Sequence, residues 1–125
     1  MSSENFAIGN MADDVVSLTL NLCGKDEMKT LRFPKVFYAN YVDRIVRTAL
    51  DIQKLVFEAN GIKRGEYRLE LQQEAASLCV YLNHLIRIAF DHGWISEKQR
   101  ERWQKAVISM QWAIVRWRES DIKNI

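Results

Sequence analysis

Three glutamates on one predicted helix have the spacing that comes nearest to a metal site. Glu66, Glu70 and Glu74 recur every four residues, so a helix places their carboxylates on one face. In helical bundles such carboxylates bind metal ions together with a Glu-x-x-His motif, which this sequence lacks. The glutamate row therefore predicts a solvated helix face, and we expect no metal ion and no cofactor.

The thiol and imidazole side chains do not suggest a catalytic pair either. Cys79 and His84 are five residues apart, which separates them by about 140° around a helix, too far to share a metal ion. Cys79 lies on an apolar stripe and is predicted to be a small buried side chain. His84 lies opposite that stripe and is predicted to be exposed. His92 ends a predicted helix, where the helix dipole favours a cation and thus a capping role.

The motifs of common enzyme classes are absent from the sequence. There is no glycine-rich phosphate-binding loop and no G-x-S-x-G turn. No nucleophilic side chain has a base within reach in the predicted elements. We therefore expect no catalytic residues and predict a protein that is not an enzyme.

Charge is distributed unevenly along the chain, although the net charge is only +2. Residues 1–27 have one basic side chain against five acidic ones, a net charge of −4, and the remainder has a net charge of +6. A basic body is compatible with an anionic partner such as nucleic acid. It is equally compatible with a solvated surface of mixed sign, so charge alone leaves both interpretations open.

Length and composition indicate one ordinary globular domain. The chain has 125 residues, of which 48% are apolar and 27% are charged. Its longest apolar runs are only a few residues, which predicts no membrane-spanning segment. The N-terminus lacks a basic flank followed by an apolar core, so we expect no signal peptide and a cytoplasmic location.

Apolar residues that recur at intervals of three and four predict three helices of similar length. The predicted helices cover residues 38–60, 66–91 and 96–119. Short connections between successive helices are typical of an antiparallel bundle. We therefore predict a mainly α fold in which residues 15–125 form a single domain.

Residues that start and stop helices support these boundaries. Pro34 suits a helix start because its fixed φ and missing N–H cost little there. Gly61 and Gly93 are predicted to end the first two helices in a left-handed conformation. Ser96 and Gln99 have the spacing of a capping box, which predicts the start of the last helix.

The segment before Pro34 has an ambiguous pattern. Residues 1–14 show no period and are expected to be a mobile leader. Apolar residues alternate with polar ones over 16–22 and again over 28–33, which favours a β-hairpin over 15–33. An amphipathic helix over 13–23, the fourth helix of the bundle, is the alternative.

The last predicted helix has more apolar surface than a bundle core requires. One stripe suffices for the core, yet Ile108, Trp112 and Val115 form a second stripe. An exposed apolar patch of this kind, with Trp and Arg nearby, is typical of a protein interface. We predict that these three residues form a homo-oligomer interface, unless the N-terminal segment covers them.

Four segments of the sequence together resemble a known family. They are LRFPK (31–35), RIVRTALDIQKLVFEAN (44–60), LNHLIRIAFDHGWIS (82–96) and IVRW (114–117). They resemble the Avd-type four-helix-bundle family, the accessory variability proteins of diversity-generating retroelements. That family is related to small bundle proteins encoded in ribosomal-RNA intervening sequences. The resemblance covers residues 31–119, about 70% of the chain, and Trp117 matches a tryptophan near the end of the family's last helix.

The resemblance implies a bundle of about four helices, a helix before Pro34, and assembly as a homopentamer. It also implies binding to RNA or DNA and association with a reverse transcriptase. The basic positions that match are Arg44, Arg47, Arg64, Arg87 and Arg116. The resulting hypothesis is a non-catalytic, oligomeric adaptor of a mobile genetic element. The alternatives are a helical protein–protein interaction module with no nucleic-acid role, and a small enzyme whose site forms between subunits.

Overall fold

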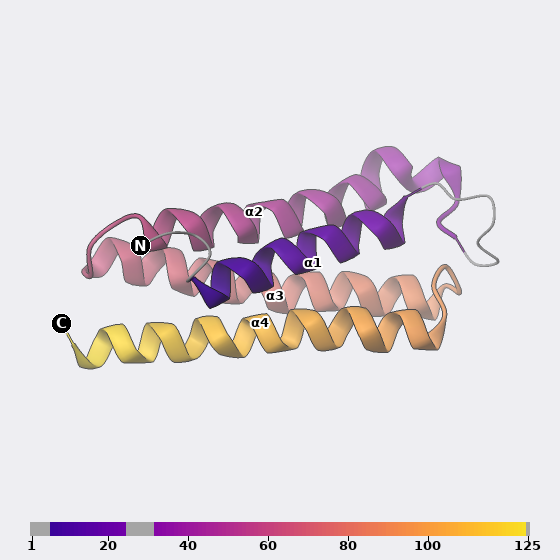
Figure 1. The fold of residues 1–125 in the computed structure, drawn as a ribbon. Helices are drawn as coiled ribbons and strands as arrows, with labels where there is room; N and C mark the ends of the chain where they lie inside the picture. Colours follow the sequence, from indigo (N-terminus) through magenta and orange to yellow (C-terminus); the bar gives the residue numbers. More distant parts are fainter. Residues whose placement is uncertain (1–5, 25–31, 125) are drawn as a thin grey trace.

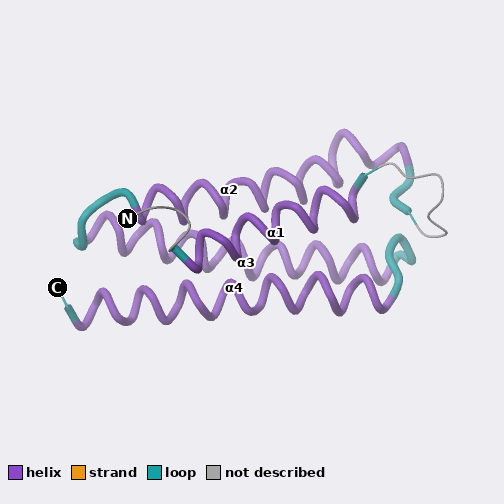
Figure 2. Tube along the Cα trace, in the orientation of Figure 1, coloured by secondary structure: helices purple, strands orange, loops and turns teal. Residues whose placement is uncertain are grey.

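The computed structural model describes residues 6–24 and 32–124, which form an antiparallel four-helix bundle (Figure 1). The helices are α1 (Ala7–Cys23), α2 (Asp43–Asn60), α3 (Glu66–Asp91) and α4 (Glu97–Lys123). Each helix packs mainly against two neighbours, so that α1 and α3 both lie between α2 and α4. Figure 2 shows no strand in the described part of the chain.

The β-hairpin predicted over residues 15–33 is wrong for the residues described, because Ala7–Cys23 is helical. In this helix Val15, Val16 and Thr19 form a buried stripe, whereas Leu20, one of the alternating apolar residues, is exposed. Packing between α2 and α4 selects this stripe. The helix starts inside the expected leader of residues 1–14, whose first five residues lie outside the described part of the chain. Residues 25–31, which include most of the expected second strand, also lie outside it.

The three helices predicted from periodicity are confirmed, with one irregular start. The second has the predicted bounds, Glu66–Asp91, and the last continues to Lys123. The first becomes α-helical only at Asp43. A 3-10 turn (Lys35–Phe37) and a π-helical turn (Tyr38–Val42) come before it. The chain therefore enters the bundle through two non-α turns after Pro34.

Local hydrogen bonds decide the helix ends, and the backbone conformation predicted for one of them is wrong. The capping box is present: Ser96 Oγ accepts from the Gln99 backbone N–H at 3.1 Å, and Gln99 Oε1 accepts from the Ser96 N–H at 2.8 Å. Gly93 has φ +75°, as predicted for a left-handed stop. The helix before Gly61 ends at Asn60 as predicted, but Gly61 has φ −83° and stays right-handed, with its N–H bonded to carbonyls of the preceding turn.

The core runs the length of the bundle and is built from the predicted stripes. Its largest fully buried side chains include Trp103, Ile45, Ile52, Leu82 and Ile86. Burying several such side chains stabilises the fold by about 2 kcal/mol each. Side chains on the outside of this core are therefore held on a rigid frame, and they are the ones available for binding.

Candidate functional site

A pocket of about 790 Å³ lies between α2 and α3, at the end of the bundle where α2 begins and α3 ends. Its volume is in the range of small-ligand sites. Its lining consists of rings, aliphatic side chains and a few polar groups, and contains no carboxylate. The lining residues are Phe37, Asn40, Tyr41, Arg44, Tyr81, Leu85, Ile88, His92 and Trp94.

The irregular backbone at both helix ends positions the rings of this pocket. Trp94 follows the left-handed Gly93, and its N–H bonds back to the Ala89 carbonyl at 3.0 Å, a Schellman motif. The Trp94 ring stacks on His92, with ring centroids 5.0 Å apart, and lies 5.1 Å from Phe37. The two ends thus build one continuous aromatic wall.

Tyr41 lines the pocket, and a hydrogen bond fixes the position of its side chain. Its hydroxyl donates to the Leu85 carbonyl oxygen at 2.6 Å, which joins the π-helical turn to α3. Burial raises the pKa of Tyr41 to about 12, so its hydroxyl is neutral at physiological pH. Its ring lies 5.4 Å from Trp94 in an edge-to-face arrangement. Tyr41 therefore offers a ligand its ring surface, with its hydroxyl already engaged.

Arg44 gives the pocket its positive charge. Within the described residues no carboxylate lies within ion-pair distance of its guanidinium, whereas Arg47, one turn further along, pairs with Asp43 at 2.7 Å. Asn40 uses its side-chain oxygen to accept from the Tyr41 N–H at 2.6 Å, which leaves its NH₂ group as a donor. Donors therefore dominate the polar part of the lining.

The five arginines predicted to bind nucleic acid are distributed over three helices and one loop. Arg44 lines the pocket and Arg47 lies exposed beside it on α2. Arg64 lies beyond the far end of α2, while Arg87 on α3 and Arg116 on α4 are exposed. The fold brings Arg44 and Arg47 onto successive turns, and it does not gather all five at one end of the bundle.

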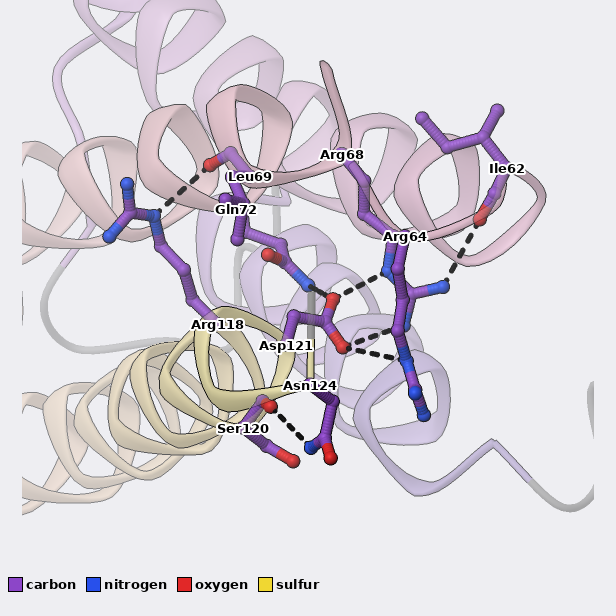
Figure 3. Close-up of polar contacts among 9 residues, drawn as sticks. All are labelled: Ile62, Arg64, Arg68, Leu69, Gln72, Arg118, Ser120, Asp121 and Asn124. Atoms are coloured by element: carbon purple, nitrogen blue, oxygen red, sulfur yellow. Dashed lines mark hydrogen bonds and ion pairs between the residues drawn. The ribbon is translucent and has the colours of Figure 1, made fainter. Parts of the chain in front are cut away.

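A cluster built around a buried ion pair lies at the other end of the bundle (Figure 3). Arg68 Nε lies 2.7 Å from the carboxylate of Asp121, which is almost fully buried. Gln72 donates to the same carboxylate at 2.8 Å, and Arg64 approaches it at 3.5 Å. The cluster ties the start of α3 to the last turn of α4. Of the five arginines predicted to bind nucleic acid, Arg64 is the one that lies within ion-pair distance of this carboxylate.

The second apolar stripe of α4 remains largely uncovered in the described chain. Ile108 is 43% exposed and Trp112 is 53% exposed, while Val115 is half-buried against the core. The N-terminal helix does not cover them, because α1 contacts the core stripe of α4, where the indole of Trp103 bonds to Thr19. The predicted interface residues are thus on the surface, as an interface requires.

The neighbouring helix extends this apolar surface. Gln104 donates to the Asn83 carbonyl and Arg118 to the Leu69 carbonyl, which sets the register of the antiparallel α3–α4 pair. In that register Val80, 56% exposed, lies at the level of Ile108. We call Val80, Ile108, Trp112 and Val115 the outer apolar patch.

The other side chains considered as catalytic or metal-binding candidates have the burial or exposure predicted from the sequence. Cys79 is fully buried, and burial raises its pKa to about 12, which keeps the thiol protonated and unreactive. His84 and the three glutamates Glu66, Glu70 and Glu74 are exposed. Across residues 6–24 and 32–124, no three His, Cys, Asp or Glu side chains are grouped to hold a metal ion.

None of the helices described is long and apolar enough to cross a membrane. No protein-family model matches the sequence, and no curated protein or solved structure matches it significantly.

Sequence reasoning missed the aromatic pocket. It assigned His92 a capping role and made no prediction for Phe37, Tyr81 or Trp94 beyond their place in the chain. The available signal was the high density of rings just after Pro34 and just after Gly93. These rings form one pocket only because the bundle brings the segment before α2 and the segment after α3 together.

Proposed function

We propose that this chain is a non-catalytic, oligomeric adaptor of a mobile genetic element, which binds nucleic acid and a reverse transcriptase in the cytoplasm. The observation that carries the proposal is the outer apolar patch, in which Ile108 and Trp112 are about half exposed and the exposed Val80 of α3 lies at the level of Ile108. Large apolar side chains that stay in contact with water add no burial free energy to stability. A partner that covers them would gain that free energy on binding. A second copy of the chain is the partner that the proposal assigns to this patch.

Exposed arginines support the nucleic-acid part of the proposal. Arg44, Arg87 and Arg116 are exposed and form no ion pair within the described residues. Guanidinium groups bind phosphates well because they donate two parallel hydrogen bonds. Repetition of the chain around a symmetry axis would multiply these contacts, so even a modest charge per subunit would give strong binding.

The four-helix bundle supports the assignment to an element-encoded adaptor. A helix precedes Pro34, as the resemblance to Avd-type proteins implies, although the local alternation of residues favoured a strand. By the same resemblance we propose a homopentamer, and a reverse transcriptase as the protein partner.

Two measurements on the full chain test the proposal. Light scattering behind a sizing column gives the native mass, and we expect about five times 14.7 kDa. A titration with labelled RNA and DNA at two salt concentrations measures the electrostatic part of binding, which should weaken steeply as salt rises. A monomer at micromolar concentration would contradict oligomerisation. Absence of binding at low salt would contradict the nucleic-acid role.

A protein–protein interaction module without a nucleic-acid role is the second candidate. The buried pair between Arg68 and Asp121 favours it, because this carboxylate neutralises one of the basic side chains at that end of the bundle. This candidate predicts an oligomer or a complex through the outer apolar patch and no salt-dependent binding to either nucleic acid.

A further inference from the structure

The aromatic pocket between α2 and α3 is independent of the outer apolar patch, and the proposed function does not assign it a ligand. We propose that it binds one nucleotide unit, with the base against the rings of Tyr81 and Trp94 and the phosphate on Arg44. The nucleotide is either free or an unpaired residue of a single strand. For a strand, this inference deepens the nucleic-acid part of the proposed function. For a free nucleotide, it stands independently.

The rings in the pocket suit a flat, apolar ligand. Of the rings that line the pocket, Tyr81 and Phe37 are exposed, whereas Trp94 and Tyr41 are partly buried. Exposed rings beside a cavity keep apolar surface in contact with water, and a stacked base would cover it. Bases stack on aromatic side chains with little dependence on sequence, because every base has a π-face.

The polar groups of the pocket suit an anion. Arg44 carries a full charge without a counter-ion among the described residues, and Asn40 keeps its NH₂ donors after its oxygen has bonded to the Tyr41 N–H. His92 and the Tyr81 hydroxyl add two further polar groups at the rim. Because no carboxylate lines the pocket, it would accept a phosphate and disfavour a cationic ligand.

The side chains that line the pocket are held in position without a ligand. The π-helical turn Tyr38–Val42 brings Asn40 and Tyr41 to the pocket, and such turns within α-helices often mark functional sites. Tyr41 is held by its 2.6 Å hydrogen bond to Leu85, and Trp94 is held by the Schellman motif. A rigid ring wall needs little ordering when it binds, which favours affinity.

The base and phosphate contributions can be tested separately on the full chain. Calorimetric titrations would use adenosine 5′-monophosphate and ribose 5-phosphate as the free ligands. A single-stranded 12-mer and an abasic 12-mer with the same phosphates would serve as the strands. We expect the base-containing member of at least one pair to bind about ten-fold more tightly than its base-free counterpart.

Matched variants locate this preference in the pocket. Tyr81→Ala should remove most of the ten-fold preference, whereas Tyr67→Ala, which removes an exposed tyrosine of α3 outside the pocket, should retain it. Arg44→Gln should weaken binding of both members of a pair. Lys54→Gln, at an exposed position of α2 outside the pocket, should leave free-nucleotide binding unchanged. Both tyrosines are exposed, and a thermal unfolding curve for each variant would verify that it folds.

The outcomes separate this inference from the proposed function. Equal binding of the base-containing and base-free members of both pairs would overturn the pocket assignment, and salt-dependent strand binding would still support the adaptor. Equal effects of Tyr81→Ala and Tyr67→Ala would also overturn it. Base-dependent binding of the free nucleotide, lost in Tyr81→Ala, would confirm the pocket even if no strand bound and the nucleic-acid role failed.

Discussion

The indole N–H of Trp103 donates to the hydroxyl oxygen of Thr19 at 3.0 Å, which links α4 to α1 across 84 residues of sequence. The Thr19 hydroxyl in turn donates its own hydrogen to the Val15 carbonyl at 2.7 Å. Both side chains are almost completely buried. Every polar hydrogen in this chain of contacts thus has an acceptor inside an apolar core, which a buried indole requires.

Replacement of Thr19 by valine should destabilise the bundle by about 2 kcal/mol. Valine preserves the shape but leaves the buried Trp103 N–H without an acceptor, and an unsatisfied buried donor costs about 1–3 kcal/mol. Urea unfolding followed by circular dichroism would measure the loss. Ser17→Val, an exposed site on the same helix, should change stability by less than about 0.5 kcal/mol. A loss of equal size at both positions would contradict a specific role for the hydrogen bond.

Asp121→Asn should destabilise the chain by about 3 kcal/mol. The substitution removes the negative charge that faces the largely buried Arg68, and an uncompensated buried charge is expensive. Chemical unfolding would measure this loss, with Glu119→Gln as an exposed control on the same helix turn. If the cluster is structural, the Asn variant should also expose more of α4 near its end to hydrogen exchange. Unchanged stability would mean that the ion pair is solvent-screened.

Stability should fall as pH rises above about 9. Burial raises the pKa of Cys79 from 9.0 to about 12 and that of Tyr41 from 10.0 to about 12. Between these values the unfolded chain has lost the two protons and the folded chain has retained them, so alkaline pH favours unfolding. Below pH 9 both states retain the protons, and these groups give no pH dependence.

Unfolding measured from pH 7 to 11 tests this expectation. A variant that combines Cys79→Ala and Tyr41→Phe should be less stable at pH 7 but should show a shallower decline above pH 9. All other ionisable side chains are common to both proteins, so the difference in slope isolates the two buried groups. Parallel pH profiles would contradict the assignment.

Gly9→Ala should destabilise the bundle by about 1 kcal/mol, although alanine favours helices. A Cβ at Gly9 would lie 2.6 Å from a ring carbon of Phe6 and 2.8 Å from one of Phe57. The two rings pack edge to face, and Phe6 also packs on Trp117, so neither moves freely. Overpacking costs about 1–3 kcal/mol, against about 1 kcal/mol gained in helix propensity.

Gly65→Ala provides the matched control for Gly9→Ala. Its added Cβ would meet no atom within 4 Å, and its extended backbone is open to any residue. Thermal unfolding of the two variants should therefore give a lower melting temperature for Gly9→Ala only. A stabilised Gly9→Ala variant would mean that the rings repack without cost.

Charges placed in the outer apolar patch should dissociate the proposed oligomer without unfolding the monomer. We expect the double variant Ile108→Lys with Trp112→Lys to elute with a lower native mass than the parent chain. Leu50→Lys, which alters an exposed apolar residue of α2 outside the patch, should retain the parent mass. Light scattering with circular dichroism measures both properties. An unchanged mass in the double variant would place the interface elsewhere.

The helices could be predicted because their signals are local. The capping box of Ser96 and Gln99 lies within one turn, and the stripe that predicted Glu66–Asp91 needs only the helical period. The alternating residues of 16–22 carried a weaker signal, since their spacing is compatible with a strand and with a helix. Contacts with α2 and α4 resolved that choice, and they involve residues far away in the chain.

Local pattern established the helical core of this protein, the burial of Cys79 and the surplus apolar residues Ile108 and Trp112, because each depends on positions a few residues apart. Tertiary packing decided which charged side chains are paired with an opposite charge and which remain free to bind a ligand. Asp121 is 53 residues from Arg68, and only the antiparallel pairing of α3 and α4 makes them partners. The aromatic pocket arose in the same way, since Tyr41 and Trp94 face one cavity only after two distant helix ends meet. Such long-range contacts depend on how whole helices dock, which no short stretch of sequence encodes.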